Sequence, residues 1–284
     1  MKPINHVSGL QALHSRYDTF LVDAWGVLHD GTGCYPGVKH CLEQLVGLGK
    51  RLIILSNAAR RQDAICEELE RVGITDNLYQ RVVSSGELTW QVLSAGVSKI
   101  QPGEMGYYLG PERSRSILDG LDYRWTEFLE DASFVLNTGA PTGNPQNTNL
   151  LVPLLEKMLV RQLPMICANP DQAAVRGGEL GISAGAIARL YQSLGGETVI
   201  YYGKPGAEIF EMAVGKGVNK SGVLMVGDGF ETDIAGAVGY GIDSLLIAGG
   251  IHDAELQPLN EGVVARNARL YSAVPDYFCQ YFCY

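Results

Sequence analysis

The feature that most constrains the fold is a repeated alternation between short apolar segments and amphipathic helical segments. Residues 19–22 and 51–55 are largely apolar runs of strand length, and apolar residues at helical spacing follow them at 38–48 and about 63–72. Strands that are apolar on both faces are typical of parallel sheets covered by helices on both sides. We therefore predict an α/β fold with a Rossmann-like parallel sheet.

The middle of the chain carries a complete set of such elements of its own. Strand-like and helical patterns alternate there at 107–109, 134–136, 150–160, 165–167 and 184–194. The flanking segments each supply part of one open sheet. Residues 199–202 are expected to form the strand with which the chain returns to that sheet. A length of 284 residues suffices for two modest domains. We expect a core of residues 1–87 and 198–284, with an inserted α/β cap domain at 88–197.

The charge balance excludes two classes of partner. The chain has 22 Lys and Arg residues against 31 Asp and Glu residues, a formal net charge of −9. Such a surface repels nucleic-acid phosphates and anionic membranes. No apolar run reaches the length of a membrane span, and the first residues lack the compact apolar stretch of a signal peptide. We expect a cytoplasmic protein that binds neither nucleic acid nor membrane.

Polar side chains of a particular kind follow the predicted strands where the strands end. In chain order they are Asp23, Ser56, Asn57, Lys204 and Asp228, with Asp233 at the start of the next helix. In open parallel sheets such residues meet at the carboxyl edge. Converging carboxylates repel one another unless a hard cation lies between them, and Mg²⁺ prefers oxygen ligands. The pattern therefore predicts a magnesium site equipped for phosphoryl transfer through a covalent acyl phosphate.

These segments, taken in order, resemble the haloacid dehalogenase-like (HAD) hydrolases, specifically the type IIA branch that includes NagD-like and p-nitrophenylphosphatase-like sugar phosphatases. The resemblance covers nearly the whole chain. Its four motifs are matched by Phe-Leu-Val-Asp-Ala-Trp-Gly-Val-Leu at 20–28, Leu-Ser-Asn at 55–57, Gly-Lys-Pro at 203–205 and Gly-Asp-Gly-Phe-Glu-Thr-Asp at 227–233. The Asn-Pro-Asp signature of the cap is matched at 169–171, and a Gly-rich segment follows at 181–186.

The resemblance implies roles for the core residues of the site. Asp23 would be the nucleophile, and the carbonyl of Trp25 would be a metal ligand. Ser56 and Asn57 would contact the phosphoryl oxygens, with Arg60 at the basic position that often follows them. Lys204 would neutralise charge between nucleophile and phosphate. Asp228 would bind Mg²⁺, and Asp233 would support the metal directly or through water.

The resemblance also implies two features outside the core residues. Asn169 and Asp171 of the cap are candidates for substrate contact, although a structural turn is an equally good interpretation of this signature. A homodimer formed through the cap is common in the resembling branch, and the sequence leaves the oligomeric state open.

The sequence departs from the family at one position. Family phosphatases carry a second aspartate two residues after the nucleophile, where it protonates the leaving group, and Trp25 occupies that position here. An indole N–H only donates and does not cycle a proton at neutral pH. General acid–base assistance worth about 10²–10⁴-fold would then be missing unless another group supplies it.

Three interpretations follow from Trp25. In the first, which we favour, the protein is a Mg²⁺-dependent hydrolase of a small phosphorylated metabolite such as a sugar phosphate, and either His29 or Asp30 takes over proton transfer or the leaving group needs no proton. In the second, the aromatic residue indicates a dehalogenase-like hydrolase, which ranks lower because Asp228 and Asp233 keep the magnesium pattern. In the third, turnover is lost and the protein binds a phosphometabolite or a partner.

Overall fold

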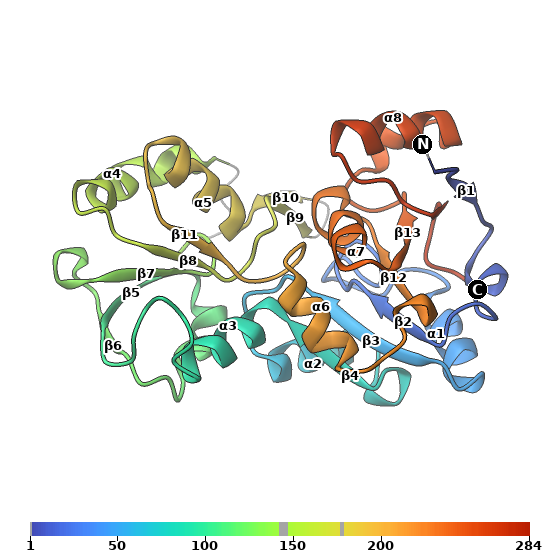
Figure 1. Cartoon of the computed structure of the whole chain (residues 1–284), viewed down its shortest axis with the longest axis horizontal. Coiled ribbons are helices and arrows are strands. Elements are labelled where there is room, and N and C mark those ends of the chain that lie inside the picture. Colours follow the sequence, from blue (N-terminus) through green and yellow to red (C-terminus); the bar gives the residue numbers. More distant parts are fainter. Residues whose placement is uncertain (1, 142–146, 177–178) are drawn as a thin grey trace.

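The computed structural model describes residues 2–141, 147–176 and 179–284, and these form two separate parallel sheets (Figure 1). The larger sheet has the strand order β1-β14-β13-β12-β2-β3-β4, and all of its paired strands run parallel. The smaller sheet has the order β11-β8-β7-β5-β6 and is also parallel. The predicted α/β class is confirmed.

The larger sheet is built from both ends of the chain. Its strands are β1 (Asn5–His6), β2 (Thr19–Val22), β3 (Arg51–Ser56), β4 (Arg81–Ser84), β12 (Val223–Gly227), β13 (Asp243–Ile247) and β14 (Tyr277–Cys279). Its helices are α1 (Val38–Gly47), α2 (Gln62–Arg71), α3 (Ser85–Ser94), α6 (Ala207–Val214), α7 (Ala235–Tyr240) and α8 (Glu261–Leu270).

Helices cover both faces of this sheet, as its continuously apolar strands require. Phe20 of β2 packs in one buried cluster with Leu42 of α1, whereas the next residue, Leu21, packs in another cluster with Phe210 of α6. Successive strand residues point to opposite faces, so both faces are dry and the polar groups are confined to the strand ends.

The smaller sheet has its own strands, helices and buried clusters. Its strands are β5 (Met105–Leu109), β6 (Arg124–Thr126), β7 (Phe134–Asn137), β8 (Met165–Cys167) and β11 (Val199–Tyr201), beside α4 (Val152–Val160) and α5 (Ala184–Ser193). An antiparallel pair, β9 (Ala173–Arg176) and β10 (Glu179–Ile182), stands apart from both sheets. We propose that these elements form the cap.

One predicted boundary differs from the structure. The strand at 199–202 was expected to belong to the core sheet. It is β11, which pairs with β8 at the edge of the smaller sheet. With the smaller sheet proposed as the cap, β11 belongs to the cap and the proposed core resumes after Tyr201. A short apolar run predicts a strand but carries no information about which of two sheets it joins.

Within the described part of the chain, no helix is both long and apolar enough to cross a membrane.

Candidate active site

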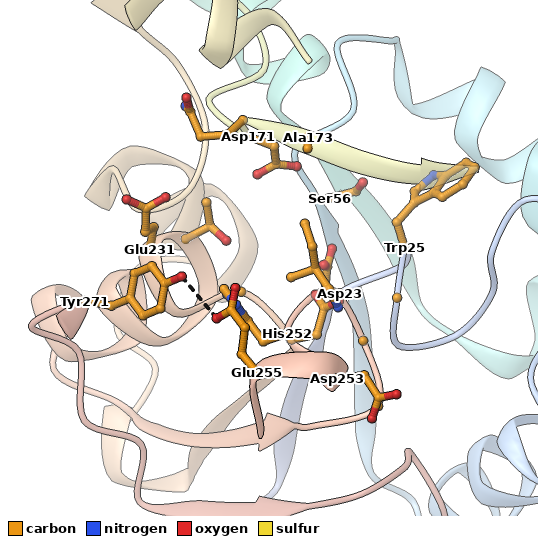
Figure 2. Close-up of a pocket in the computed structure, with 18 of the residues that line it drawn as sticks. Asp23, Trp25, Ser56, Asp171, Ala173, Glu231, His252, Asp253, Glu255 and Tyr271 are labelled. Carbon is orange, nitrogen blue, oxygen red and sulfur yellow. Dashed lines mark hydrogen bonds and ion pairs between the residues drawn. The ribbon is translucent and has the colours of Figure 1, made fainter. Parts of the chain in front are cut away.

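A cavity of about 510 Å³ lies at the carboxyl ends of the strands of the larger sheet (Figure 2). Asp23, which follows β2, and Asp228, which follows β12, line it together with Ser56 at the end of β3. Asn169 and Asp171, on the segment after β8, line it from the smaller sheet. The structure thus brings the strand-end residues Asp23, Ser56 and Asp228 together at this edge, and it places Asn169 and Asp171 of the Asn-Pro-Asp signature beside them.

Three carboxylates form a cluster suited to a metal ion. Asp23, Asp228 and Asp233 each offer an oxygen, and these oxygens lie within 4.8 Å of one another. The Asp228 carboxylate accepts a hydrogen bond from the Ile251 backbone N–H at 2.7 Å. Gly26 is in the left-handed region with φ 79°, and a Cβ at this position would lie 2.0 Å from Asp228 Oδ2. Glycine is therefore required for the close approach of this loop to the carboxylate.

The Lys204 ammonium contacts two of these carboxylates. Its side chain is 1% exposed, and its Nζ lies 2.8 Å from Asp23 Oδ1, 2.7 Å from Asp233 Oδ1 and 3.0 Å from the Leu55 carbonyl oxygen. Burial lowers the pKa of Lys204, but the neighbouring carboxylates, Asp23 first among them, raise it by more, so its pKa is above the usual value. Lys204 is therefore a fixed positive charge beside Asp23.

The acidic cluster remains short of positive charge despite Lys204. Burial raises the pKa of Asp23 well above its usual value, although the Lys204 ammonium opposes this shift. Burial, and then the nearby Asp233 carboxylate, raise the pKa of Asp228 to about 7. Buried carboxylates with raised pKa values indicate a site that a bound cation would stabilise.

Asn57 binds two other residues of the site, Asp171 and Lys204, and is not among the described residues that line the cavity. Its Nδ2 donates to Asp171 Oδ1 at 2.7 Å and to the Lys204 carbonyl at 3.1 Å, and its Oδ1 accepts from the Lys204 N–H at 2.7 Å. Among the described lining residues only Ser56 of this motif faces the cavity. The structure therefore gives Asn57 a different position from the predicted contact with phosphoryl oxygens.

Arg60 is also placed differently from the sequence prediction. Its guanidinium forms an ion pair with Glu68 of α2, and both side chains are largely buried. Arg60 is not among the described residues that line the cavity, so the predicted contact with substrate is not supported. The spacing from Ser56 gave no information on Glu68, the acidic partner of this arginine almost two turns into α2.

Trp25 lines the cavity, but neither predicted replacement for the missing acid does (Figure 2). His29 is 1% exposed, its Nδ1 accepts the Gly31 N–H at 3.0 Å, and burial lowers its pKa. Asp30 accepts hydrogen bonds from the Thr32 hydroxyl and N–H, which lower its pKa. Both side chains thus stabilise the loop, and the expectation that one of them transfers the proton is not supported.

On the cap side, Asn169 and Asp171 form a compact turn. Asn169 Oδ1 accepts the Asp171 N–H at 2.9 Å, which is the hydrogen bond of an Asx turn. Asn169 therefore has the structural role that was one of its two interpretations. Asp171 instead directs its carboxyl group toward the core, where Asn57 binds it.

The sequence analysis missed a second wall of the cavity, formed after β13 and α8. His252, Glu255 and Tyr271 line it, with His252 Nδ1 3.1 Å and the Tyr271 hydroxyl 3.3 Å from Glu255 Oε2. Figure 2 shows this group on the other side of Asp23 from Trp25. The sequence contained a signal for this wall, because Gly249 and Gly250 follow β13 after Ala248 and mark another strand end at the same edge.

Two family models match this chain. One described as haloacid dehalogenase-like hydrolase matches residues 20–124, and one described as HAD-hydrolase-like matches residues 201–273. The segment between them contains most of the smaller sheet.

Individual relatives match over most of their length. An acid sugar phosphatase from Staphylococcus aureus is 26% identical over 84% of this chain and 90% of its own. A solved glycerol phosphate phosphatase from Mycobacterium tuberculosis, in complex with magnesium, has a TM-score of 0.68 at 22% identity, over 96% of this chain and 77% of its own.

The strongest support for the family comes from a solved hydrolase of the haloacid dehalogenase-like family from Brucella suis. It is 32% identical, with a TM-score of 0.84, and the match covers 97% of this chain and 99% of that one. Together with the two family models, this match shows that the protein belongs to the haloacid dehalogenase-like hydrolases.

Proposed function

We propose that the protein is a Mg²⁺-dependent phosphatase that hydrolyses a small phosphorylated metabolite through a phosphoenzyme on Asp23. The observation that carries the proposal is the cluster at the cavity floor, where Asp23 lies 2.8 Å from Lys204 and within a group of three carboxylates. A nucleophilic carboxylate beside a fixed cation and a metal site is the arrangement that phosphoryl transfer requires.

The residues present fit a hard divalent cation. Three buried carboxylates with oxygens within 4.8 Å match the oxygen ligands that Mg²⁺ prefers. Asp23 and Asp228 would hold the ion, and the Trp25 carbonyl is the further ligand that the family resemblance implies. Asp233 is bound by Lys204 and by the Gly229 N–H at 3.0 Å, so it supports the site. When bound, the ion would neutralise charge on the phosphoryl oxygens.

The chain's own residues account for the nucleophilic steps. One oxygen of Asp23 attacks phosphorus while its other oxygen accepts the Ala24 N–H at 2.8 Å, which fixes the orientation of the carboxylate. Lys204 holds a permanent positive charge beside the attacked group, and the Ser56 hydroxyl faces the cavity to donate to a phosphoryl oxygen. Water then attacks phosphorus and releases phosphate and the free Asp23 carboxylate.

The size of the site and the names of the relatives support a sugar phosphate as the substrate. A cavity of about 510 Å³ has room for a phosphate and a small polyol. The relatives named above are called an acid sugar phosphatase and a glycerol phosphate phosphatase. Hydroxyl-binding groups are available in Glu255 and Tyr271 on the far wall.

A second candidate function is binding of a phosphometabolite without turnover, and Trp25 is the observation that favours it. Trp25 lines the cavity at the position where a proton donor is expected. Halide release by a dehalogenase-like hydrolase needs no proton at that position, but it also needs no metal, and the three-carboxylate cluster argues against it.

One assay separates these functions. Phosphate release is measured from p-nitrophenyl phosphate, acetyl phosphate and a panel of sugar and polyol phosphates, with Mg²⁺ and with EDTA. Magnesium-dependent release supports the phosphatase. Ligand-induced thermal stabilisation without release on any substrate would support the binding protein instead.

The raised pKa of Asp228 gives a prediction for metal binding. Without metal this carboxyl holds a proton up to about pH 7, and Mg²⁺ must displace that proton. Below pH 7 the apparent affinity is expected to fall by up to about tenfold per pH unit. The rise in melting temperature on adding Mg²⁺ should therefore be larger at pH 8 than at pH 5.5, measured by calorimetry against NaCl of equal ionic strength. A rise that shrinks as pH increases would contradict the assignment.

A further inference from the structure

The proposed reaction needs a proton donor that the core does not supply at its usual position. Trp25 occupies that position, while His29 and Asp30 lie outside the cavity lining. The donor must face the same cavity as Asp23 and must be held in place. Asp171, on the loop between β8 and β9, satisfies both conditions.

Asp171 is fixed from both sides. Its backbone carbonyl accepts the Gly185 N–H at 3.1 Å at the start of α5, and its own N–H donates to Asn169. Its Oδ1 accepts from Asn57, which in turn binds the backbone of Lys204, whose ammonium contacts Asp23. A continuous chain of contacts therefore fixes the Asp171 carboxyl relative to the nucleophile. Figure 2 shows it over Ser56 and Asp23.

Burial favours the neutral form of Asp171. The charged groups near it are the Lys204 ammonium, which favours ionisation, and the carboxylates of Asp23, Asp228 and Asp233, which oppose it. Burial raises the pKa of Asp171 to about 6, and Lys204 and the Asn57 hydrogen bond oppose a larger shift. A phosphoryl group in the cavity adds negative charge and raises this pKa further. An ionised Asp171 would repel phosphate, whereas the protonated carboxyl is a hydrogen-bond donor.

We propose that Asp171 of the cap is the acid–base residue of the reaction, in place of the missing core aspartate. This rests on the proposed function. In the first step the Asp23 oxygen forms a bond to phosphorus, the bond from phosphorus to the leaving oxygen breaks, and the Asp171 proton passes to that oxygen. In the second step water attacks phosphorus, its proton passes to the Asp171 carboxylate, and the bond between Asp23 and phosphorus breaks. Both residues are thereby restored.

His252 is the competing group on the cavity wall. Its Nδ1 lies 3.1 Å from Glu255, and its ring packs against Phe230 and Tyr271, which stack on each other, with centroids 5.1 and 5.0 Å away. In the described part of the chain its side chain forms no hydrogen bond or ion pair with Asp23 or Lys204, and Figure 2 places it on the wall opposite Trp25. We assign it to leaving-group binding, and the experiment tests this alternative too.

The test compares a good and a poor leaving group in the metal-loaded enzyme. For Asp171→Asn, kcat/KM is expected to fall by about 10²–10⁴-fold on the best alkyl phosphate of the panel, and by less than about tenfold on p-nitrophenyl phosphate, whose leaving group needs no proton. His252→Gln should lower both to a similar extent. Asp30→Asn changes a half-buried carboxylate that binds Thr32 within the loop, and it should change neither.

Each other outcome overturns the proposal. An equal loss on both substrates for Asp171→Asn would show a positioning role only, and a loss for His252→Gln that depends on the leaving group would move the acid to His252. If Asp171→Asn does not fold, the pH dependence of the wild type is the test. The ratio of kcat/KM on the alkyl phosphate to kcat/KM on p-nitrophenyl phosphate should fall about tenfold per pH unit above the pKa of the acid. A ratio that does not change with pH refutes the proposal. Absence of Asp23-dependent phosphate release from wild type would refute the proposed function itself, a distinct result.

Discussion

Replacing Asp23 by asparagine is expected to lower phosphate release by at least about 10⁴-fold on every substrate, while the protein stays folded. The amide is nearly the same size as the carboxylate and still presents an oxygen to the Ala24 N–H, which the carboxylate accepts at 2.8 Å. It does not, however, form an acyl phosphate. Because attack by Asp23 is required in the first step with every leaving group, the loss should be as large on p-nitrophenyl phosphate as on alkyl phosphates.

Two further measurements make the Asp23→Asn result specific. The melting temperature without metal should change little or rise, since burial raises the pKa of Asp23 and its ionised form is costly there. The stabilisation by Mg²⁺ should shrink, because one charged ligand of the cluster is lost. Asp30→Asn is the matched control and should keep full activity. Residual Mg²⁺-dependent turnover within about tenfold of wild type would contradict a covalent intermediate on Asp23.

The position of the site was predictable from the sequence because it depends on topology. Asp23 and Asp228 follow strands of one parallel sheet, and the carboxyl ends of such strands share an edge whatever the side chains around them. The same argument would have found the loop after β13 had it been applied there. Lys204 lies at the same edge, in contact with Asp23 and Asp233, and its role between the nucleophile and a phosphate stays a prediction.

What the sequence did not determine depends on partners that are distant along the chain or chosen among alternatives. Arg60 pairs with Glu68 rather than facing the cavity, and spacing from Ser56 does not predict which acid it meets. The strand β11 joins the cap sheet because β8 offers a free edge, a choice that its own residues do not encode. Asp171 was predicted at the site, but its acid–base role emerged only from the Asn57 bridge that spans 114 positions of sequence.

Replacing Lys204 by methionine has the second large expected effect, on stability as well as activity. Its ammonium is buried and lies 2.8 Å from Asp23 and 2.7 Å from Asp233. Methionine fills a similar volume but leaves two buried carboxylates without their counter-charge. Breaking a buried ion pair on one side costs about 3–5 kcal/mol, which for a chain of this size lowers the melting temperature by roughly 10 °C. Activity should fall by about 10³-fold.

The pH dependence identifies the cause of that instability. Burial raises the pKa of Asp23, and without the opposing ammonium this carboxyl keeps its proton to a still higher pH in the native state, so the native state binds more protons than the unfolded state and its stability falls as pH rises. The deficit of Lys204→Met relative to wild type should therefore be largest at pH 8 and smaller at pH 5.5, by calorimetry in EDTA.

The control and the double variant decide whether charge or packing is responsible. Lys50→Met removes a lysine whose partner, Asp18, has a side chain that is 93% exposed, and it should shift the melting temperature by no more than about 2 °C because exposed ion pairs contribute little. Adding Asp23→Asn to Lys204→Met removes one of the two buried carboxylates that have lost their counter-charge, and it should recover part of the lost stability. A deficit that is independent of pH, and that the second substitution does not relieve, would show that Lys204 acts through packing rather than as the counter-charge of the nucleophile.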